Sequence, residues 1–348
     1  MAIFLGSDIF RGSGYGPGHP LNIPRVWPVI DICRAQGWLN DSQFEMVPPA
    51  TAKELECFHT PEYIQALIDA EKTQVLDEIR SKRHNIGNHS NPIYQEIYRR
   101  PATAAKASLQ GAYYLISGKH SRVFNPSGGT HHGFPDSANG FCFVNDPAIA
   151  LTTLYQNTSK KIAYVDIDAH HPDGVQNNFS HLERIILFSV HEADRWPRTG
   201  KKDDVGGGNA HNYPLPRGSN DKDLNEVITN QVLPLLLAFN PDFIVLQAGS
   251  DGLEEDPQSG LCYSNQGYWK TVSAFLQLNI PILVLGGGGY NPFTTARAWA
   301  GVWGLMIGKS PYKTKCVAES RAILQSLSFP HRLGKNIPDR WISRLYDG

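Results

Sequence analysis

The sequence has few cysteines, no cysteine pair at metal-binding spacing and no long apolar run. Its five cysteines are scattered over 348 residues and none belongs to a C-x-x-C pair, which disfavours a disulfide framework and a thiolate zinc site. No basic segment precedes the short apolar run at the N-terminus, and no apolar stretch of roughly 18 residues follows. We therefore expect a cytoplasmic protein that makes no membrane contact.

Neither sign of charge dominates the chain. The 32 Lys and Arg residues nearly balance the 33 Asp and Glu residues, and the formal net charge is -1. Because no overall basic field would attract polyanions, we expect no nucleic-acid partner. The contents of 41% hydrophobic and 19% charged residues are typical of a soluble globular protein. No repeat or linker divides the chain, so we expect one domain over residues 1–348, and a homo-oligomer stays open.

Short apolar runs alternate with helical patterns along the chain. The runs that end in glycine or polar clusters predict buried strands at residues 122–125, 162–165, 185–190, 243–246 and 282–285. Helical periodicity falls at residues 102–116, 224–239, 266–278 and 294–307, with a kink or break expected at Pro234. This alternation predicts an α/β fold with a doubly wound, mostly parallel β-sheet flanked by helices. The Gly/Pro-rich segments 12–20 and 200–218 are expected to be long surface loops near the edge of the sheet.

Polar clusters follow each of the predicted strands. Ligands of open α/β sheets bind outside the carboxyl ends of the strands, so these clusters should meet on one edge. They are GGTHH (128–132), DIDAHH (166–171), SVH (189–191), GSD (249–251) and GGGGY (286–290).

Asp168, His170 and Asp251 are the candidate metal ligands in these clusters. A catalytic zinc takes three His or carboxylate ligands and keeps one position open. Asp168 and His170 stand two apart, so their side chains can project to one side of an extended segment. Taken singly each residue could be a capping or solvated group. Several titratable groups buried on one edge are costly unless they bind a metal or pair.

The adjacent histidines His131 and His132 need separate partners because consecutive side chains diverge. Asp166 and Asp173 are the available carboxylates. Each could orient one imidazole, giving one histidine that activates water and one that stays charged. The alternative is two loop histidines that make ordinary hydrogen bonds.

The ordered motifs resemble those of zinc-dependent histone deacetylases of the arginase-deacetylase superfamily. The similarity extends to bacterial relatives such as acetoin-utilisation deacetylases and acetylpolyamine amidohydrolases, and it covers residues from about 15 to about 310. A C-terminal extension is then expected to pack on the domain. The motifs are YGPGHPLNIPR, FHTPEYI, GGTHHG, GFCFVND, YVDIDAHHPDGVQ, FSVH, AGSDGLEEDP and LGGGGYN.

The resemblance implies that Asp168, His170 and Asp251 hold one catalytic zinc ion. It makes His132 the general base that takes a proton from water, with Asp173 behind it.

The resemblance also implies two groups that steady the developing oxyanion. His131, paired with Asp166, would remain charged, and Tyr290 would donate its hydroxyl. The glycine run at residues 286–289 allows a tight turn and gives Tyr290 room to swing.

A substrate channel and a monovalent-cation site are implied as well. Aromatic walls suit an extended methylene chain. The channel residues implied are Phe141, Trp196, Gly140, Gln258 and Ser90. The potassium site implied comprises Asp166, Asp168, His170, Ser189 and Val190. Arg25 matches an arginine near an internal channel of the family, with a structural salt bridge as an equal alternative.

Three positions depart from the family pattern. Pro172 stands where a glycine is usual, and it cannot supply the additional Asp that a binuclear manganese hydrolase of the arginase type requires. Ser90 replaces an aspartate that grips a peptide backbone. Gln258 stands where lysine deacetylases are apolar and polyamine-specific enzymes are acidic.

We therefore expect a zinc-dependent amidohydrolase that removes acetyl or other small acyl groups from lysine side chains of peptides or proteins. Acetylated diamines, acetylputrescine or acetylcadaverine, are the alternative substrates. A catalytically silent binding module is a more remote alternative. Neither a G-x-S-x-G elbow nor a nucleotide-binding glycine motif occurs in the sequence.

Overall fold

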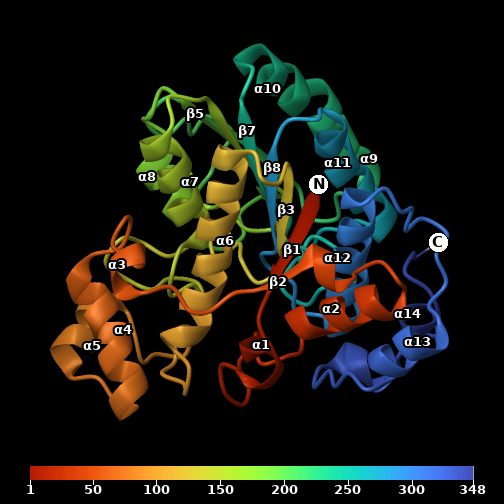
Figure 1. Ribbon diagram of the computed structural model, residues 1–348, viewed down its shortest axis with the longest axis horizontal. Helices are drawn as coiled ribbons and strands as arrows, with labels where there is room; N and C mark the ends of the chain where they lie inside the picture. Colours follow the sequence, from red (N-terminus) through yellow and green to blue (C-terminus); the bar gives the residue numbers. More distant parts are fainter. Residues whose placement is uncertain (348) are drawn as a thin grey trace.

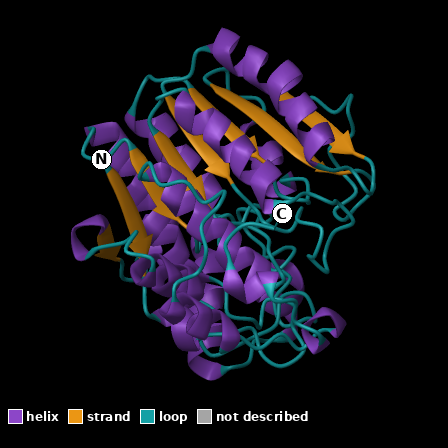
Figure 2. Ribbon diagram, turned by 90° about the vertical axis from the view of Figure 1, so that its right-hand side faces the viewer, coloured by secondary structure: helices purple, strands orange, loops and turns teal. Residues whose placement is uncertain are grey.

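The computed structural model describes residues 1–347, and its centre is one eight-stranded sheet with the order β2-β1-β3-β8-β7-β4-β5-β6. Every neighbouring pair is parallel, and helices cover both faces (Figure 2). The predicted fold class is therefore confirmed. The strands are β1 (Ala2–Gly6), β2 (Phe44–Met46), β3 (Arg122–Asn125), β4 (Ile162–Asp166), β5 (Ile185–Glu192), β6 (Ala210–Leu215), β7 (Phe243–Gln247) and β8 (Ile282–Leu285).

The helices form two layers and a lobe. In Figure 1, α6, α7 and α8 lie on one side of the strands and α2, α11 and α12 on the other, while α3, α4 and α5 gather beside α6. The helices are α1 (Ile9–Gly12), α2 (Val26–Ala35), α3 (Ala52–Leu55), α4 (Pro61–Thr73), α5 (Glu78–His84), α6 (Arg99–Ser117), α7 (Asp146–Asn157), α8 (Asp173–Phe179), α9 (Asp221–Val227), α10 (Leu233–Phe239), α11 (Asn265–Gln277), α12 (Pro292–Met306), α13 (Ala318–Gln325) and α14 (Arg340–Ser343).

The sheet is apolar on both faces because helices bury both of them. All residues of β4, β5, β7 and β8 are buried, as expected for parallel strands between helical layers. Small residues let α6 pack close to the sheet. A Cβ added at Gly111 would lie 2.8 Å from Leu283 and 3.1 Å from Val123, so a larger residue there would push α6 away from β3 and β8.

Some predicted boundaries are wrong. The segment 200–218, predicted as a loop, contains β6, which pairs with β5 at the edge of the sheet. Its sequence AHNYPL has no apolar run, and an edge strand tolerates Pro214 because only one side of it is paired. The helical region predicted at 224–239 is interrupted by a π-helical segment, Ile228–Val232, so the break expected at Pro234 falls just before it, and Pro234 lies in the first turn of α10.

The C-terminal segment after α12 folds back onto the domain. Arg297 of α12 is fully buried, and its guanidinium donates to Asp347 at 2.6 Å and to the carbonyl of Arg344 at 2.9 Å. Trp341 of α14 stacks on Phe293 with ring centroids 5.2 Å apart. Among the described residues, no helix combines the length and apolarity needed to cross a bilayer.

Candidate active site

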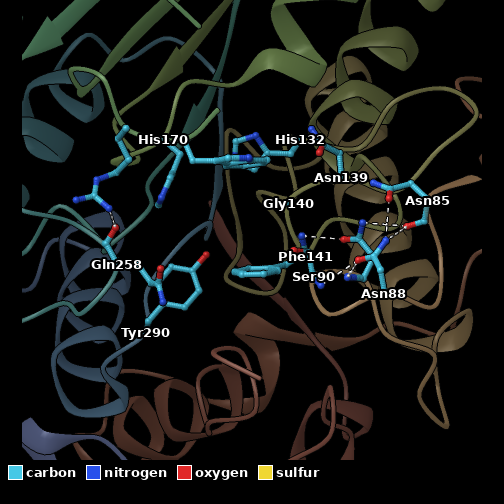
Figure 3. Close-up of a pocket in the computed structure, with 13 residues that line it drawn as sticks. Asn85, Asn88, Ser90, His132, Asn139, Gly140, Phe141, His170, Gln258 and Tyr290 are labelled. Atoms are coloured by element: carbon cyan, nitrogen blue, oxygen red, sulfur yellow. Dashed lines mark hydrogen bonds between the residues drawn. The ribbon is translucent and has the colours of Figure 1, made fainter. Parts of the chain in front are cut away.

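A pocket of about 330 Å³ opens at the carboxyl ends of the strands, where the polar clusters converge (Figure 3). Eight residues predicted for the site line it directly. These are Ser90, His132, Gly140, Phe141, His170, Trp196, Gln258 and Tyr290.

The three candidate metal ligands converge at the base of this pocket. Ligand atoms of Asp168, His170 and Asp251 lie within 4.8 Å of one another, and no other His, Cys, Asp or Glu group in the described part of the chain meets this criterion. His170 Nδ1 lies 3.1 Å from Asp168 Oδ1 and 2.9 Å from Asp251 Oδ2. The two carboxylates come from the loops after β4 and β7, which are neighbours in the sheet. Strand pairing therefore builds the cluster.

The electrostatics of the cluster favour a bound cation. Burial opposes a charge on His170, but Asp168 and Asp251 outweigh that effect and raise the pKa of His170 to about 10. Burial and the charge of Asp168 raise the pKa of Asp251. Two desolvated carboxylates beside one imidazole thus attract positive charge to a single point, and this donor set fits a divalent metal ion with an open coordination position.

The adjacent histidines are each held by a separate carboxylate. His131 Nδ1 lies 2.8 Å from Asp166, and His132 Nδ1 lies 2.6 Å from Asp173. Their Nε2 atoms approach within 3.0 Å, so both rings turn toward the same point. The predicted pairings are thus present in the structure.

The two histidines have opposite proton affinities. Burial disfavours a charged His131, but the carboxylates of Asp166 and Asp168 outweigh burial and raise its pKa to about 9. Burial and the positive charge of His131 lower the pKa of His132 to about 4, against a smaller opposing effect of Asp173. Near neutral pH the pair therefore holds one charged and one neutral imidazole.

Two glycine segments cross behind the site. A Cβ added at Gly129, whose φ is +90°, would lie 2.6 Å from the backbone of Gly287. The GGTHH and GGGGY segments can therefore meet only as glycines. This contact lets the N–H of Gly288 donate to Asp168 at 2.6 Å. Arg25 forms no ion pair among the described residues. Its Nη1 donates instead to the carbonyls of Gly287, at 3.0 Å, and Gly289.

Tyr290 extends from the end of the glycine run into the pocket. Figure 3 shows its hydroxyl directed toward the side where His170 and His132 lie. Burial raises the pKa of Tyr290 well above its usual value, so the hydroxyl keeps its proton and can donate. The backbone N–H of Tyr290 donates to Asp256 at 2.6 Å. Asp256 was not singled out from the sequence, although it follows Asp251 in the AGSDGLEEDP motif.

Aromatic side chains wall the pocket. The ring centroids of Trp196 and His132 are 4.6 Å apart, and those of Phe141 and Tyr290 are 6.2 Å apart. Gly140 has no room for a side chain, because a Cβ there would lie 2.1 Å from the Trp196 ring.

The mouth contains Ser90 and Gln258 together with residues that the sequence did not reveal. These are Asn85, Asn88, Asn91, Asn139 and Arg195. Asn91 Oδ1 accepts the N–H of Phe141 at 3.1 Å and so fixes one channel wall. The only sequence signal for Arg195 is its position next to Trp196.

Three of the five residues predicted for a monovalent-cation site, Asp166, Ser189 and Val190, lie on adjacent strands, and Asp168 and His170 follow in the loop after β4. Asp166 of β4 is paired in register with Ser189 of β5, and Val190 follows it. The N–H of Asp168 donates to Asp166 at 3.0 Å.

Such a site on a parallel α/β sheet is typical of hydrolases that use a metal ion. Residues 19–306 match the family model of the histone deacetylase domain. The chain therefore belongs to the histone deacetylase family, whose members are hydrolases that act on amide bonds.

Curated relatives and solved structures agree with this assignment. The chain is 34% identical over 303 residues to probable histone deacetylase 19 of Zea mays, covering 85% of this chain and 58% of the relative. It is 32% identical over 292 residues to histone deacetylase 8 of Xenopus tropicalis, covering 82% of this chain and 79% of that relative. The chain thus spans little more than half the length of the maize relative.

Two solved structures superpose over the whole chain. A histone deacetylase homologue in complex with SAHA has a TM-score of 0.93 and 31% identity, and the match covers 100% of this chain and 94% of that chain. A histone deacetylase homologue from Aquifex aeolicus gives the same values.

Proposed function

We propose that this protein is a zinc-dependent amidohydrolase that removes acetyl or other small acyl groups from lysine side chains of peptides or proteins. The observation that carries the proposal is the buried Asp168–His170–Asp251 cluster beside two histidines of opposite proton affinity. Zinc fits this cluster because one imidazole and two carboxylates are ligands that it accepts. When bound, it would polarise the amide carbonyl and lower the pKa of water.

The histidine pair supplies the proton transfers. His132 is neutral, and Asp173 orients it through Nδ1, so its Nε2 can take a proton from the attacking water. Water adds to the amide carbon, the C–N bond then breaks, and the leaving amine takes up the proton that His132 had accepted. His131 keeps its positive charge beside the oxygen that becomes negative.

Tyr290 contributes a further hydrogen bond to that oxygen. A hydroxyl held in place before the reaction stabilises developing charge without reorganisation. The aromatic side chains of Phe141 and Trp196 line the approach, and they suit the methylene chain of an acylated lysine.

We extend the proposal to a potassium ion held near Asp166, Asp168, His170, Ser189 and Val190. The in-register pairing of Asp166 with Ser189 supports a shared site on these two strands.

Acetylputrescine or acetylcadaverine is the alternative substrate class. Position 90 is Ser90 and carries no carboxylate that could hold a peptide backbone, which favours this alternative. Position 258 is Gln258 and carries no acid that could attract an ammonium group, which opposes it. The homologue solved with SAHA has the same overall fold, which is compatible with either class.

Metal analysis and a substrate comparison test the proposal together. Purified protein should contain about one zinc ion per chain, and two manganese ions would contradict the zinc assignment. Rates are then measured on acetyl-lysine peptides and acetylated diamines. A kcat/KM for diamines more than about a hundredfold above that for peptides would contradict the choice of substrate.

A further inference from the structure

Arg195 is the only Lys, Arg, Asp or Glu side chain that lines the pocket in the described part of the chain. The rest of the mouth is made of neutral amides, Ser90 and aromatic rings. Arg195 and Trp196 also line an open groove outside the pocket. Arg195 therefore lies at the point where the pocket opens outward.

Three hydrogen bonds fix the guanidinium of Arg195. Its Nε and Nη2 both bind Glu192, and its Nη1 donates to the carbonyl of Gln258 at 2.5 Å. Glu192 is only 4% exposed, and it also accepts the N–H of Gly260 at 2.7 Å. Arg195 thus joins the loop that carries Trp196 to the loop that carries Gln258.

The Glu192–Arg195 pair has no net charge. Any preference between substrate end groups must therefore arise from which of the two side chains can hydrogen-bond to the substrate. A guanidinium has five N–H donors, and three are used here. The other two have no acceptor among the described residues, and the Arg195 side chain lines the pocket. Glu192 lines the outer groove but not the pocket, and its carboxylate already accepts two hydrogen bonds from Arg195 and one from Gly260. What the pocket presents is hydrogen-bond donors, which favour a carboxylate or carbonyl oxygen over an ammonium group.

We infer that Arg195 is a specificity-determining residue that binds an oxygen at the far end of the substrate's alkyl chain. The substrate class is then an acylated amine whose chain ends in a carboxylate or a main-chain carbonyl, as a lysine residue does. Diamines, which end in an ammonium group, are disfavoured. This inference rests on the proposed function and selects between its two substrate classes.

Substrates that differ only in the far end group test the inference. The set comprises 6-acetamidohexanoate, 6-acetamidohexanamide and N-acetylcadaverine, which carry a carboxylate, a neutral amide and an ammonium group. The expected order of kcat/KM is carboxylate, amide, ammonium, with at least about a tenfold ratio between the first and last, the size of one charge-assisted hydrogen bond.

The test variant is the double substitution Arg195→Met with Glu192→Gln, which leaves no unpaired buried carboxylate. It should bring the carboxylate-to-ammonium ratio to within about threefold, mainly through KM, while zinc content stays unchanged. Arg198→Met is the matched control, because Arg198 lines the outer groove but not the pocket. It should keep the wild-type ratio.

If the double variant does not fold, Arg195→Lys replaces it. Lysine keeps the charge but loses the forked donors, so the ratio should again fall. The inference is overturned if N-acetylcadaverine is the best substrate of the wild type, or if a folded Arg195 variant keeps the wild-type ratio. A wild-type protein that lacks zinc and hydrolyses none of the three substrates contradicts the proposed function itself, which is a different outcome.

Discussion

The base of the pocket and its mouth are built in opposite ways. We define the floor as His131, His132, Asp168, His170 and Asp251, and the rim as Asn85, Asn88, Ser90, Arg195 and Gln258. Every floor side chain contacts another side chain at or near 3 Å and is buried or nearly so. The rim is exposed or half-buried, and part of it is held only by local contacts such as Asn88 Nδ2 to Asn85 Oδ1, 2.7 Å.

This difference suggests separate roles, with catalysis at the floor and discrimination between substrates at the rim. A desolvated charge without its partner costs several kcal/mol, so the loss of a charged floor residue destabilises the residue paired with it. A solvated side chain carries no such penalty. We therefore expect the rim to tolerate substitution better than the floor, except at Arg195, which pairs with the buried Glu192, and we propose that the substrate is selected there.

One buried carboxylate connects the rim to Tyr290, which lies beside the floor. Asp256 accepts the N–H of Tyr290 at 2.6 Å and the N–H of Gln258 at 2.9 Å. Burial, with the nearby charge of Asp251, raises the pKa of Asp256 well above its usual value. A change at Gln258 could therefore reach Tyr290 through Asp256, so floor and rim are least independent on this side of the pocket.

The largest expected effect is that of Asp251→Ala. This change removes one of the three candidate ligands and one of the two carboxylates that attract a cation to the cluster. Metal content and activity should both fall to background, as measured by elemental analysis and hydrolysis of an acetylated peptide. Asp41→Ala is the control, since that carboxylate is exposed and its closest ion pair is 3.8 Å long. Retention of stoichiometric zinc by Asp251→Ala would contradict the ligand assignment.

His132→Ala comes next. Removal of a general base costs on the order of 10² to 10⁴ in rate, and kcat should fall by this factor while zinc stays bound. His131→Ala serves as the comparison, since it removes the charged partner instead. The assigned roles would be reversed if His131→Ala were severely impaired and His132→Ala nearly normal.

Tyr290→Phe tests the oxyanion donor. The loss of one such donor raises the barrier by ~2.7–4 kcal/mol, on the order of 10² to 10³ in kcat. KM and zinc content should change little, because the ring still packs against Phe141. Tyr113→Phe on α6, whose side chain is exposed, provides a matched control. A normal kcat in Tyr290→Phe would contradict the role of the Tyr290 hydroxyl as an oxyanion donor.

The sequence predicted much of the floor because two local patterns determine it. Asp168 and Asp251 each follow an apolar run, and parallel pairing of β4 with β7 brings the ends of those runs together. The roles came from the family resemblance. The sequence does not predict strands β1, β2 and β6, because β2 and β6 are short or polar edge strands and β1 gives only a short apolar run at the N-terminus.

The rim was less predictable because loop conformation builds it. Asn85 has a left-handed φ of +54°, and its amide reaches the carbonyl of Ala138, 53 positions along the chain, at 2.8 Å. No periodicity encodes a contact between two loops. Ser90 and Gln258 were found only through the resemblance, and Arg195 had no signal of its own.

Acid should lower the folding stability by protonating His59, which helps to hold the segment that carries His131. His59 Nε2 accepts the N–H of Asn145 at 2.9 Å, and Asn145 donates to the carbonyls of His131 and Gly133. Burial lowers the pKa of His59 from 6.5 to about 4. The folded protein thus binds this proton less tightly than the unfolded chain does. The stabilisation is complete above about pH 6.5 and is lost as the pH falls toward about 4, with a slope of at most ~1.4 kcal/mol per pH unit.

Urea unfolding of the wild type and of His59→Gln between pH 7.5 and 4.5 measures this loss. Other buried histidines also lower the stability in acid, so the difference between the two proteins is the relevant quantity. It should shrink as the pH falls. A difference that is independent of pH would show that folding does not change the pKa of His59.

Gln258→Glu should have the smallest effect, and it acts on the rim alone. The new carboxylate is partly solvated, and exposed charge pairs contribute ~0.2–1 kcal/mol. The preference for N-acetylcadaverine over an acetyl-lysine peptide should therefore rise by no more than about fivefold. Ser90→Asp, on an exposed loop of the same mouth, is the matched variant and should also stay within that range. Zinc content and kcat should not change in either protein. A fall in kcat of a hundredfold in Gln258→Glu, with zinc still bound, would mean that Asp256 transmits the change from the mouth to Tyr290. The floor and the rim would then be one unit on that side of the pocket.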